Sequence, residues 1–207
     1  MRYEKGHKDV TRKRIVDVAS KRFRKEGVEA VGLAGLMADA GLTHGGFYAH
    51  FKSKEDLVRE AVSDAFGQSN AAFERVVRDH GDGGENRSGD GGEDGFAVIV
   101  RKYLRPEHRD HPELGCAAAA LVAEIARHPE PTREAFTGHL NRLVDLVEAQ
   151  LPASPSDRRR KCATAVVALM MGSLQLARAE TDAARSAEIL DSGVEAAFAL
   201  RDRLKTN

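Results

Sequence analysis

The stretch THGGFYAHFKSK, residues 43–54, gathers polar groups that suit binding better than bond breaking. Hydroxyl, imidazole and ammonium groups alternate with aromatic rings, and two adjacent glycines stand among them. Such groups donate hydrogen bonds to phosphate oxygens, and a backbone without side chains lets another molecule approach closely. In a helix interior the glycine pair costs roughly 2 kcal/mol relative to alanine. An external contact at Gly45 and Gly46 would offset that cost, whereas a plain turn would carry no such cost.

Short helices surround this stretch and are placed to present it. An apolar stripe at helical spacing predicts a first helix that begins near residue 9 or 11 and ends at Gly27. A second, short helix is expected over residues 33–40, with Gly41 as its stop. Ser53, with Asp56 three residues later, is typical of the N-cap of a fourth helix.

Between them, Thr43 is placed to be the N-cap of a third helix. Phe47 and Phe51, four residues apart, would then share the inward face, and His44 and Tyr48 the exposed one. Two short helices joined by a tight turn form a helix-turn-helix, whose second helix enters the DNA major groove by its N-terminus. The residues that we expect to meet DNA are Thr43, His44, Gly45, Gly46, Tyr48, His50 and Lys54.

The charge is divided along the chain in a way that fits this interpretation. The 207 residues include 32 Lys and Arg against 32 Asp and Glu, so the formal net charge is zero. Residues 1–55 nevertheless hold 12 basic and 7 acidic residues, and the remainder holds 20 basic and 25 acidic. A basic N-terminal part predicts a polyanionic partner for that part alone. The basic residues Arg2, Lys5 and Lys8 could add a flexible arm, or simply form a solvated tail.

The rest of the chain predicts an all-α fold. Apolar residues recur at helical spacing after residue 95, and no alternating run indicates a strand. Residues 79–95 hold seven glycines and six acids in 17 positions, which is typical of a flexible linker. We therefore expect a DNA-binding domain over residues 1–55 and a larger helical domain over residues 56–207. The last two helices have broad apolar faces, which indicate subunit association or burial in a large monomeric core.

The N-terminal pattern resembles the DNA-binding region of the tetracycline-repressor (TetR) family over residues 11–57. The matching residues are Phe23, Gly27, Ala40, Gly41, Leu42, Thr43, Phe47, Tyr48, His50, Phe51, Ser53, Lys54, Glu55 and Leu57. The resemblance implies an N-terminal helix-turn-helix domain of three helices and a larger C-terminal helical domain for ligand binding and dimerisation. It also implies a homodimeric repressor on a palindromic double-stranded DNA operator, released when a small effector moves the two recognition helices apart.

The resemblance assigns roles to the expected DNA contacts. Thr43 and Lys54 would contact phosphate, His44 and Gly46 would face base edges, and Tyr48 and His50 would hold the DNA backbone. The sequence departs from the family at Gly32, because a Ser or Thr usually caps the second helix there. With His44 as the one direct reader in the third helix, we expect modest base readout supplemented by phosphate contacts and DNA shape.

The effector is expected in the interior of the helical domain, where aromatic and adaptable side chains gather. Few of the candidate residues are polar, which favours an apolar or aromatic effector. Each of them also fits an ordinary core position, which is the commoner role. The candidates are Phe96, Val100, Tyr103, Leu121, Phe136, Leu140, Met170 and Gln175.

Other chemistry is weakly indicated. His108 and His111 could hold a metal with His128, but prolines flank the segment and favour a loop, so no metal or cofactor is expected. Glu124 lies in an apolar stretch, where it could orient a ligand or pair with Arg127 or a neighbouring helix. The cysteines Cys116 and Cys162 sit in apolar helical patterns and are expected to be core thiols.

Location and function follow from these features. The longest apolar run, residues 116–123, is far short of the roughly 20 residues needed to span a bilayer, and the charged start is no secretory signal. We therefore expect a cytoplasmic protein without membrane contact. The function predicted is a ligand-responsive, DNA-binding transcriptional regulator and not an enzyme. The alternatives are a constitutive DNA-binding regulator without an effector and, less favoured, a helical enzyme.

Overall fold

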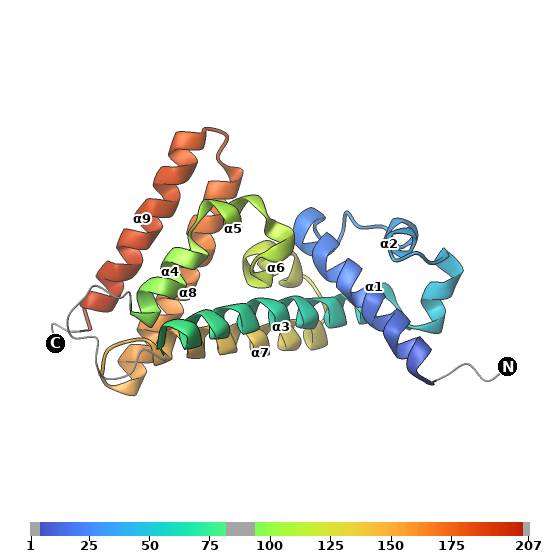
Figure 1. Ribbon diagram of the computed structural model, residues 1–207, viewed down its shortest axis with the longest axis horizontal. Helices are drawn as coiled ribbons and strands as arrows, with labels where there is room; N and C mark the ends of the chain where they lie inside the picture. Colours follow the sequence, from blue (N-terminus) through green and yellow to red (C-terminus); the bar gives the residue numbers. More distant parts are fainter. Residues whose placement is uncertain (1–4, 82–93, 205–207) are drawn as a thin grey trace. The chain divides into compact units, whose positions relative to one another are not determined.

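The computed structural model describes residues 5–81 and 94–204, and only the backbone of Lys5, Gly6, His80 and Gly81. Within these ranges the chain forms nine α-helices and two 3-10 helices without a strand, so the all-α prediction is confirmed (Figure 1). The described residues divide into two compact units: residues up to 68 with 112–139, and residues from 69 to 111 with 140–204. The domain boundary at residue 55 stays a prediction, and most of the predicted linker, residues 82–93, lies outside the described residues.

The first unit combines helices from two segments of the chain that are far apart in the sequence. It contains α1 (Lys5–Glu26), α2 (Leu33–Asp39), η1 (His44–Ala49), the first turns of α3 (Lys54–Gly81), η2 (Pro112–Leu114), α6 (Ala117–Ile125) and the start of α7 (Glu130–Ala149). Helix α1 packs against α2, α6 and η2, so the segment after residue 111 completes the core of the N-terminal helices. Side chains with no more than 1% exposure form this core: Ile15, Ala19, Phe23, Leu36, Met37, Phe47 and Leu57.

The ends of these helices follow the predicted stop and start residues. Gly27 and Gly41 have φ angles of 87° and 69°, a left-handed conformation that glycine adopts without strain and that ends α1 and α2. Ser53 is the N-cap of α3, since its Oγ accepts a 3.1 Å hydrogen bond from the Asp56 amide. Gly32 precedes α2 without a side-chain cap, as its lack of a hydroxyl requires.

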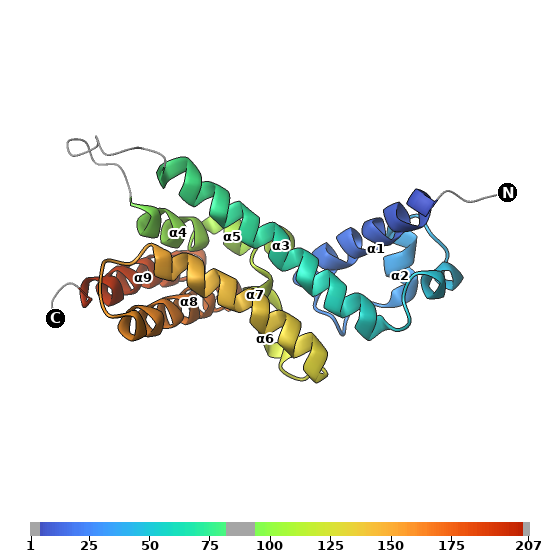
Figure 2. The ribbon, with the colours of Figure 1, turned by 90° about the horizontal axis from the view of Figure 1, so that it is seen from below.

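The second unit is a bundle whose best-packed pair is a helical hairpin. It contains α4 (Gly95–Tyr103), α5 (Pro106–Asp110), α8 (Ser156–Ala179), α9 (Ala183–Asp202) and the later turns of α3 and α7. Helices α8 and α9 lie side by side (Figure 2). They are in close contact at Gly193, where an added Cβ would lie 2.6 Å from Ser173 Oγ. Asp182 caps α9 by accepting a 2.9 Å hydrogen bond from the Arg185 amide.

One helix of the hairpin has an unusual composition. Helix α8 is long and apolar enough to cross a membrane by length and composition, and it is the one such helix in the described parts of the chain. Its buried residues, among them Val166, Met170 and Leu174, belong to the core of the bundle. A core helix of a helical bundle has the same composition, so α8 is weak evidence for a membrane span.

Three local predictions are wrong. Helix α1 begins at Lys5 rather than near residue 9 or 11, because lysine and arginine favour helix, so Lys8 is helical and not part of a flexible arm. The segment of His108 is not a loop but contains α5, because Pro106 stands in the first turn, where proline is tolerated. The predicted third helix is a six-residue 3-10 helix, η1, since its glycines do not favour a longer α-helix.

Candidate nucleic-acid interface

Helix η1 starts with an open end. Thr43 occupies the predicted N-cap position in extended conformation, and its carbonyl accepts a 3.0 Å hydrogen bond from the Gly46 amide. Its side chain makes no capping hydrogen bond and is exposed. The first turn of η1 therefore offers backbone amides and a hydroxyl to a partner, which is the arrangement that binds phosphate.

The two glycines of this turn have no internal reason to be glycine. Their φ angles are not positive, unlike those of Gly27 and Gly41. A Cβ added at Gly45 would meet nothing within 4 Å, and one at Gly46 would lie 3.7 Å from Thr43 Oγ1, an ordinary contact. The fold itself would accept alanine at both positions. What glycine provides here is a bare surface, because Gly45 is exposed and Gly46 half-buried.

The aromatic residues of η1, with Phe51 just after it, point in two directions, as the spacing predicted. Phe47 and Phe51 are buried and stacked, with ring centroids 5.4 Å apart and planes inclined by 23°. His44 and Tyr48 are exposed, with ring centroids 6.5 Å apart, and Tyr48 keeps 66% of its surface accessible. The buried pair fixes η1 to the domain, and the outer pair is left for a partner.

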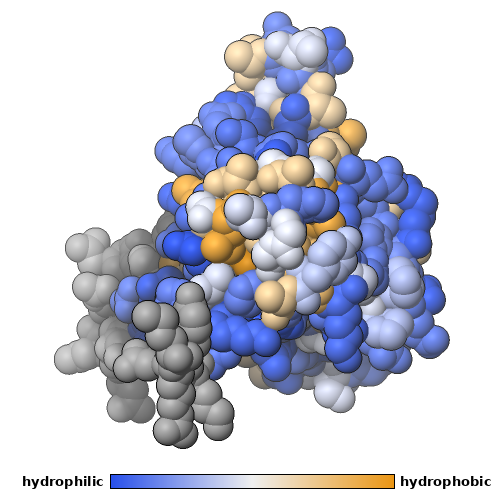
Figure 3. Space-filling model, turned by 90° about the vertical axis from the view of Figure 1, so that its right-hand side faces the viewer, coloured by the Kyte–Doolittle hydropathy of each residue, from blue (hydrophilic) through white to orange (hydrophobic). Residues whose placement is uncertain are grey.

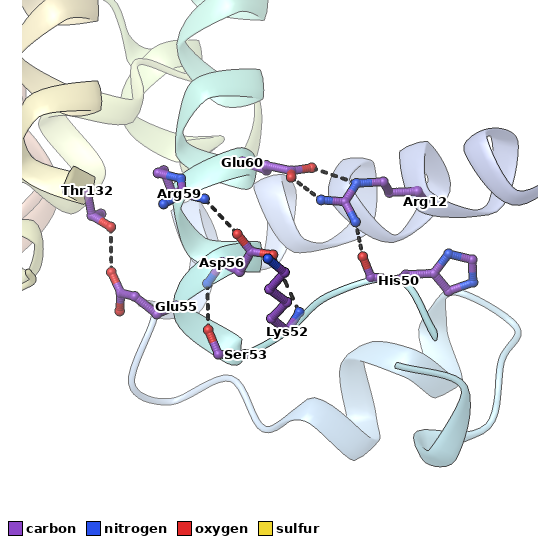
Figure 4. Close-up of polar contacts among 9 residues, drawn as sticks. All are labelled: Arg12, His50, Lys52, Ser53, Glu55, Asp56, Arg59, Glu60 and Thr132. Atoms are coloured by element: carbon purple, nitrogen blue, oxygen red, sulfur yellow. Dashed lines mark hydrogen bonds and ion pairs between the residues drawn. The ribbon is translucent and has the colours of Figure 1, made fainter. Parts of the chain in front are cut away.

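The far end of η1 is held by polar contacts from other elements. The carbonyl of His50 accepts a hydrogen bond from Arg12 of α1, and the imidazole of His50 points away from that guanidinium (Figure 4). Partial burial, with the nearby charges of Lys8 and Arg12, lowers the pKa of His50. The half-buried Lys54 donates from Nζ to the carbonyl of Val28 at 2.8 Å, so its contact with phosphate would require release of this bond.

Two carboxylates connect the N-terminal helices to the corner between α6 and α7. Glu55 accepts hydrogen bonds from Thr132 and, at 2.9 Å, from Nδ1 of His128. Glu124 accepts from the amides of Val28 at 2.7 Å and Glu29 at 3.1 Å. Glu124 therefore caps the turn after α1 and does not pair with Arg127. A contact of Glu124 with a neighbouring helix was one of the alternatives, but neither its partners nor those of Arg12 were predicted, because both contacts join residues far apart in the sequence.

The surface around these elements suits a charged partner. Figure 3 shows one face of the molecule, which is mostly hydrophilic, with apolar side chains gathered in a patch near the middle. A hydrophilic surface carrying exposed imidazole and phenol groups can donate hydrogen bonds to phosphate and base edges.

The candidate effector residues fall into both units. Leu121 and Phe136 belong to the first unit and are buried. In the second unit, Phe96, Val100, Tyr103 and Met170 are buried, whereas Leu140 and Gln175 are half-buried. The set is thus divided between the two units, and its role in ligand binding stays a prediction.

An aromatic column forms part of the second unit. Tyr103 stacks on Phe73 with ring centroids 5.7 Å apart. The rings of Tyr103 and His108 are nearly perpendicular, with centroids 4.7 Å apart. The Nδ1 atom of His108 lies 2.7 Å from the carbonyl of Tyr103. Burial lowers the pKa of His108 to about 4, so its ring is neutral at pH 7. This histidine is a core residue, and in the described ranges no group of three or more His, Cys, Asp or Glu could hold a metal ion.

Comparison with known proteins identifies the first unit. Residues 15–61 match the model of the bacterial regulatory proteins of the tetR family. The N-terminal region is therefore similar to the DNA-binding region of tetR-family regulators. It is 44% identical over 50 residues to the HTH-type transcriptional regulator AcrR of Shigella flexneri, a match that spans 24% of this chain and 23% of that protein.

The family match lies in the N-terminal region, whereas the similarity in fold to solved structures covers nearly the whole chain. A TetR-family regulator from Cytophaga hutchinsonii superposes with a TM-score of 0.70 at 18% identity and covers 98% of each chain. Another from Agrobacterium tumefaciens superposes with a TM-score of 0.67 at 22% identity, over 91% of this chain and 97% of that one. The C-terminal helices are thus similar in fold to those of the two solved structures.

Proposed function

We propose that the chain is a homodimeric transcriptional repressor that binds a palindromic operator through η1 and is released by a small effector. The observation that carries the proposal is the pair Gly45 and Gly46, which the fold does not require and which opens the first turn of η1 to solvent. The TetR-family match over residues 15–61 supports DNA as the partner. As a DNA-binding protein it would act in the cytoplasm.

Within this proposal the residues of η1 have distinct roles. The amides of the first turn and Thr43 bind phosphate, and the bare glycines let the backbone approach the duplex. His44 reads base edges, and Tyr48 and His50 hold the DNA backbone. Lys54 adds a phosphate contact once its bond to Val28 is released. The limited number of reading side chains leaves part of the specificity to DNA shape.

Dimerisation is proposed through the outer face of α8 and α9. A groove of about 480 Å³ lies along this face. Its lining combines apolar and small residues, including Leu169, Leu176 and Ile189, with the charged residues Glu180, Arg185 and Glu188. Leu176, in the last turn of α8, keeps 63% of its surface accessible, which makes it one of the few large exposed apolar side chains among the described residues. A second copy of the hairpin would cover it and would supply the two-fold symmetry that a palindromic operator requires.

The effector is proposed to be apolar or aromatic. The buried column of Phe73, Tyr103 and His108 carries no charge at pH 7, because His108 is neutral. An uncharged interior disfavours a charged ligand, since burial of an unpaired ion is costly. The candidate contacts nearest this column in the sequence are Phe96 and Val100.

Selection of bound sequences from random DNA duplexes tests the function. We expect the selected sequences to share a two-fold symmetric motif, and the affinity for it to fall steeply with salt because phosphate contacts release counterions. Tyr48→Ala should weaken this binding while leaving the fold intact. Uncharged aromatic compounds should release the DNA, whereas charged analogues should not. Binding without symmetry would exclude the dimeric repressor, and binding that no compound relieves would indicate a constitutive regulator.

A further inference from the structure

The guanidinium of Arg12 joins three elements of the first unit at one point. It donates to both carboxylate oxygens of Glu60 in α3, from Nε at 3.1 Å and from Nη2. Its Nη1 donates to the carbonyl of His50, the residue that ends η1 (Figure 4). Its central carbon lies 4.2 Å from the ring centroid of Phe51, on which it stacks. Arg12 therefore closes the stack of Phe47 and Phe51 and holds the last carbonyl of η1.

Helix η1 needs such support because its own sequence gives it little. A six-residue 3-10 helix has few internal hydrogen bonds, and isolated helices of this length are unstable in water. Thr43 makes no side-chain cap, and the two glycines weaken the first turn. The orientation of η1 must therefore come from contacts behind it and at its end. Phe47 and Phe51 provide the contacts behind η1, and Arg12 provides the contact at its end.

We propose that Arg12 is a positioning residue for DNA recognition, oriented in turn by Glu60. Arg12 fixes the angle at which the bare first turn and Tyr48 meet the duplex, and it does so without touching DNA. The proposal rests on the DNA-binding function proposed above. Arginine suits the role because its planar fork can satisfy a carboxylate and a carbonyl together, which the single ammonium of lysine cannot.

The geometry favours this role over a direct phosphate contact. The guanidinium already binds Glu60 and His50 and covers the Phe51 ring, and only 32% of the Arg12 side chain is exposed. A phosphate would have to compete with the carboxylate of Glu60 for the same donors. The two roles also predict opposite effects for Glu60. If Arg12 bound phosphate, removal of the nearby negative charge would strengthen DNA binding, whereas a positioning role requires that it weaken binding.

The test compares matched variants of the full chain on a duplex that the wild type selects from random DNA. Arg12→Met keeps an apolar stem on Phe51 and loses the donors, and Lys13→Met removes the same charge one residue along α1, where Lys13 pairs only with Asp17 among the described contacts. We expect Arg12→Met to lower operator affinity about tenfold or more, the range for loss of a charge-assisted hydrogen bond. Lys13→Met should lower it far less, and Arg12→Lys should restore part of the loss.

Three further measurements separate positioning from charge and from folding. Arg12→Met should reduce the affinity for the operator more than the affinity for a scrambled duplex. The dependence of its operator affinity on salt concentration should equal that of Lys13→Met. Loss of a phosphate contact would instead reduce both affinities alike and lower the slope of log affinity against log salt by about one. Glu60→Gln should weaken operator binding, although Asp17→Asn should not. Arg12→Met with Glu60→Gln should be no weaker than Arg12→Met alone, because the two residues act as one unit.

The outcomes are distinguishable. Thermal unfolding shows whether each variant is folded, and if Arg12→Met is not, Glu60→Gln decides, since it keeps the shape of the side chain. Equal or tighter operator binding by a folded Glu60→Gln variant overturns the inference. A wild type that selects no common sequence instead overturns the proposed function. A wild type that binds specifically while Arg12→Met binds equally well overturns only the role of Arg12.

Discussion

Helix η1 and the α8–α9 hairpin are held in place in opposite ways. The hairpin joins two helices of 24 and 20 residues, with Asp182 capping α9 and Gly193 allowing close contact. Helix η1 has six residues, no side-chain cap and two glycines at which an added Cβ would meet nothing closer than 3.7 Å. Its position depends on Phe47 and Phe51 behind it and on Arg12 at its end.

The difference shows where glycine serves the fold and where it serves a surface. At Gly193 the neighbouring helix leaves no room for a side chain, so glycine increases the stability of the hairpin. At Gly45 there is room, so glycine lowers the stability of η1 and leaves the backbone accessible. A segment that departs from local structural preference without an internal reason is a candidate for external contact.

The largest effect should come from the residue that supports η1 from behind. Phe47→Ala removes a fully buried ring and should lower the free energy of unfolding by about 3 to 5 kcal/mol, as measured by chemical denaturation. Tyr48→Ala is the matched control, because the neighbouring ring is 66% exposed. It should change stability by about 0.5 kcal/mol or less and still weaken operator binding. Similar losses of stability in both variants would show that the buried ring of Phe47 does not hold η1 in place more than the exposed ring of Tyr48 does.

The interior of the second unit should respond to pH through His108. Its pKa is about 4 in the folded protein, against about 6.5 for an ordinary histidine, so above pH 6.5 it is neutral in both states. Between pH 6.5 and 4 the unfolded chain binds the proton first, and stability falls by up to about 3 kcal/mol as the pH is lowered. His108→Gln should flatten this part of the stability profile. An unchanged slope in that variant would assign the acid sensitivity to other groups.

A smaller effect is expected at the contact between α8 and α9. In Gly193→Ala the added Cβ would lie 2.8 Å from Ser173 Cβ and 2.9 Å from Leu104 Cδ1, which requires local movement. We expect a loss of about 1 to 3 kcal/mol in the free energy of unfolding. Gly172→Ala in α8 is the control, because an added Cβ there meets nothing within 4 Å. Its stability should stay equal or rise, and a loss as large as that of Gly193→Ala would contradict the packing explanation.

The sequence predicted contacts between residues a few positions apart, but not contacts between residues far apart in the chain. The stacking of Phe47 on Phe51 and the cap at Ser53 follow from residues three or four apart, and both are confirmed. The partners of Glu55 and Arg12 lie 73 and 48 residues away, and helical periodicity identifies a buried face without identifying what covers it. The packing of η2 and α6 against α1 likewise joins segments far apart in the sequence, so spacing could not predict it.

The smallest change in stability should accompany the clearest change in function. Gly45→Ala adds a methyl group where nothing lies within 4 Å and φ is not positive, so stability should stay constant or rise by up to about 1 kcal/mol. The same methyl group would stand between the first turn of η1 and the duplex, so operator affinity should fall. Gly67→Ala, at an exposed glycine of α3 with equally open surroundings, should match the gain in stability without affecting DNA binding. If Gly45→Ala binds the operator as tightly as the wild type, the glycine pair is not there for DNA. The contrast between a glycine that serves packing and one that serves recognition would then have to be abandoned.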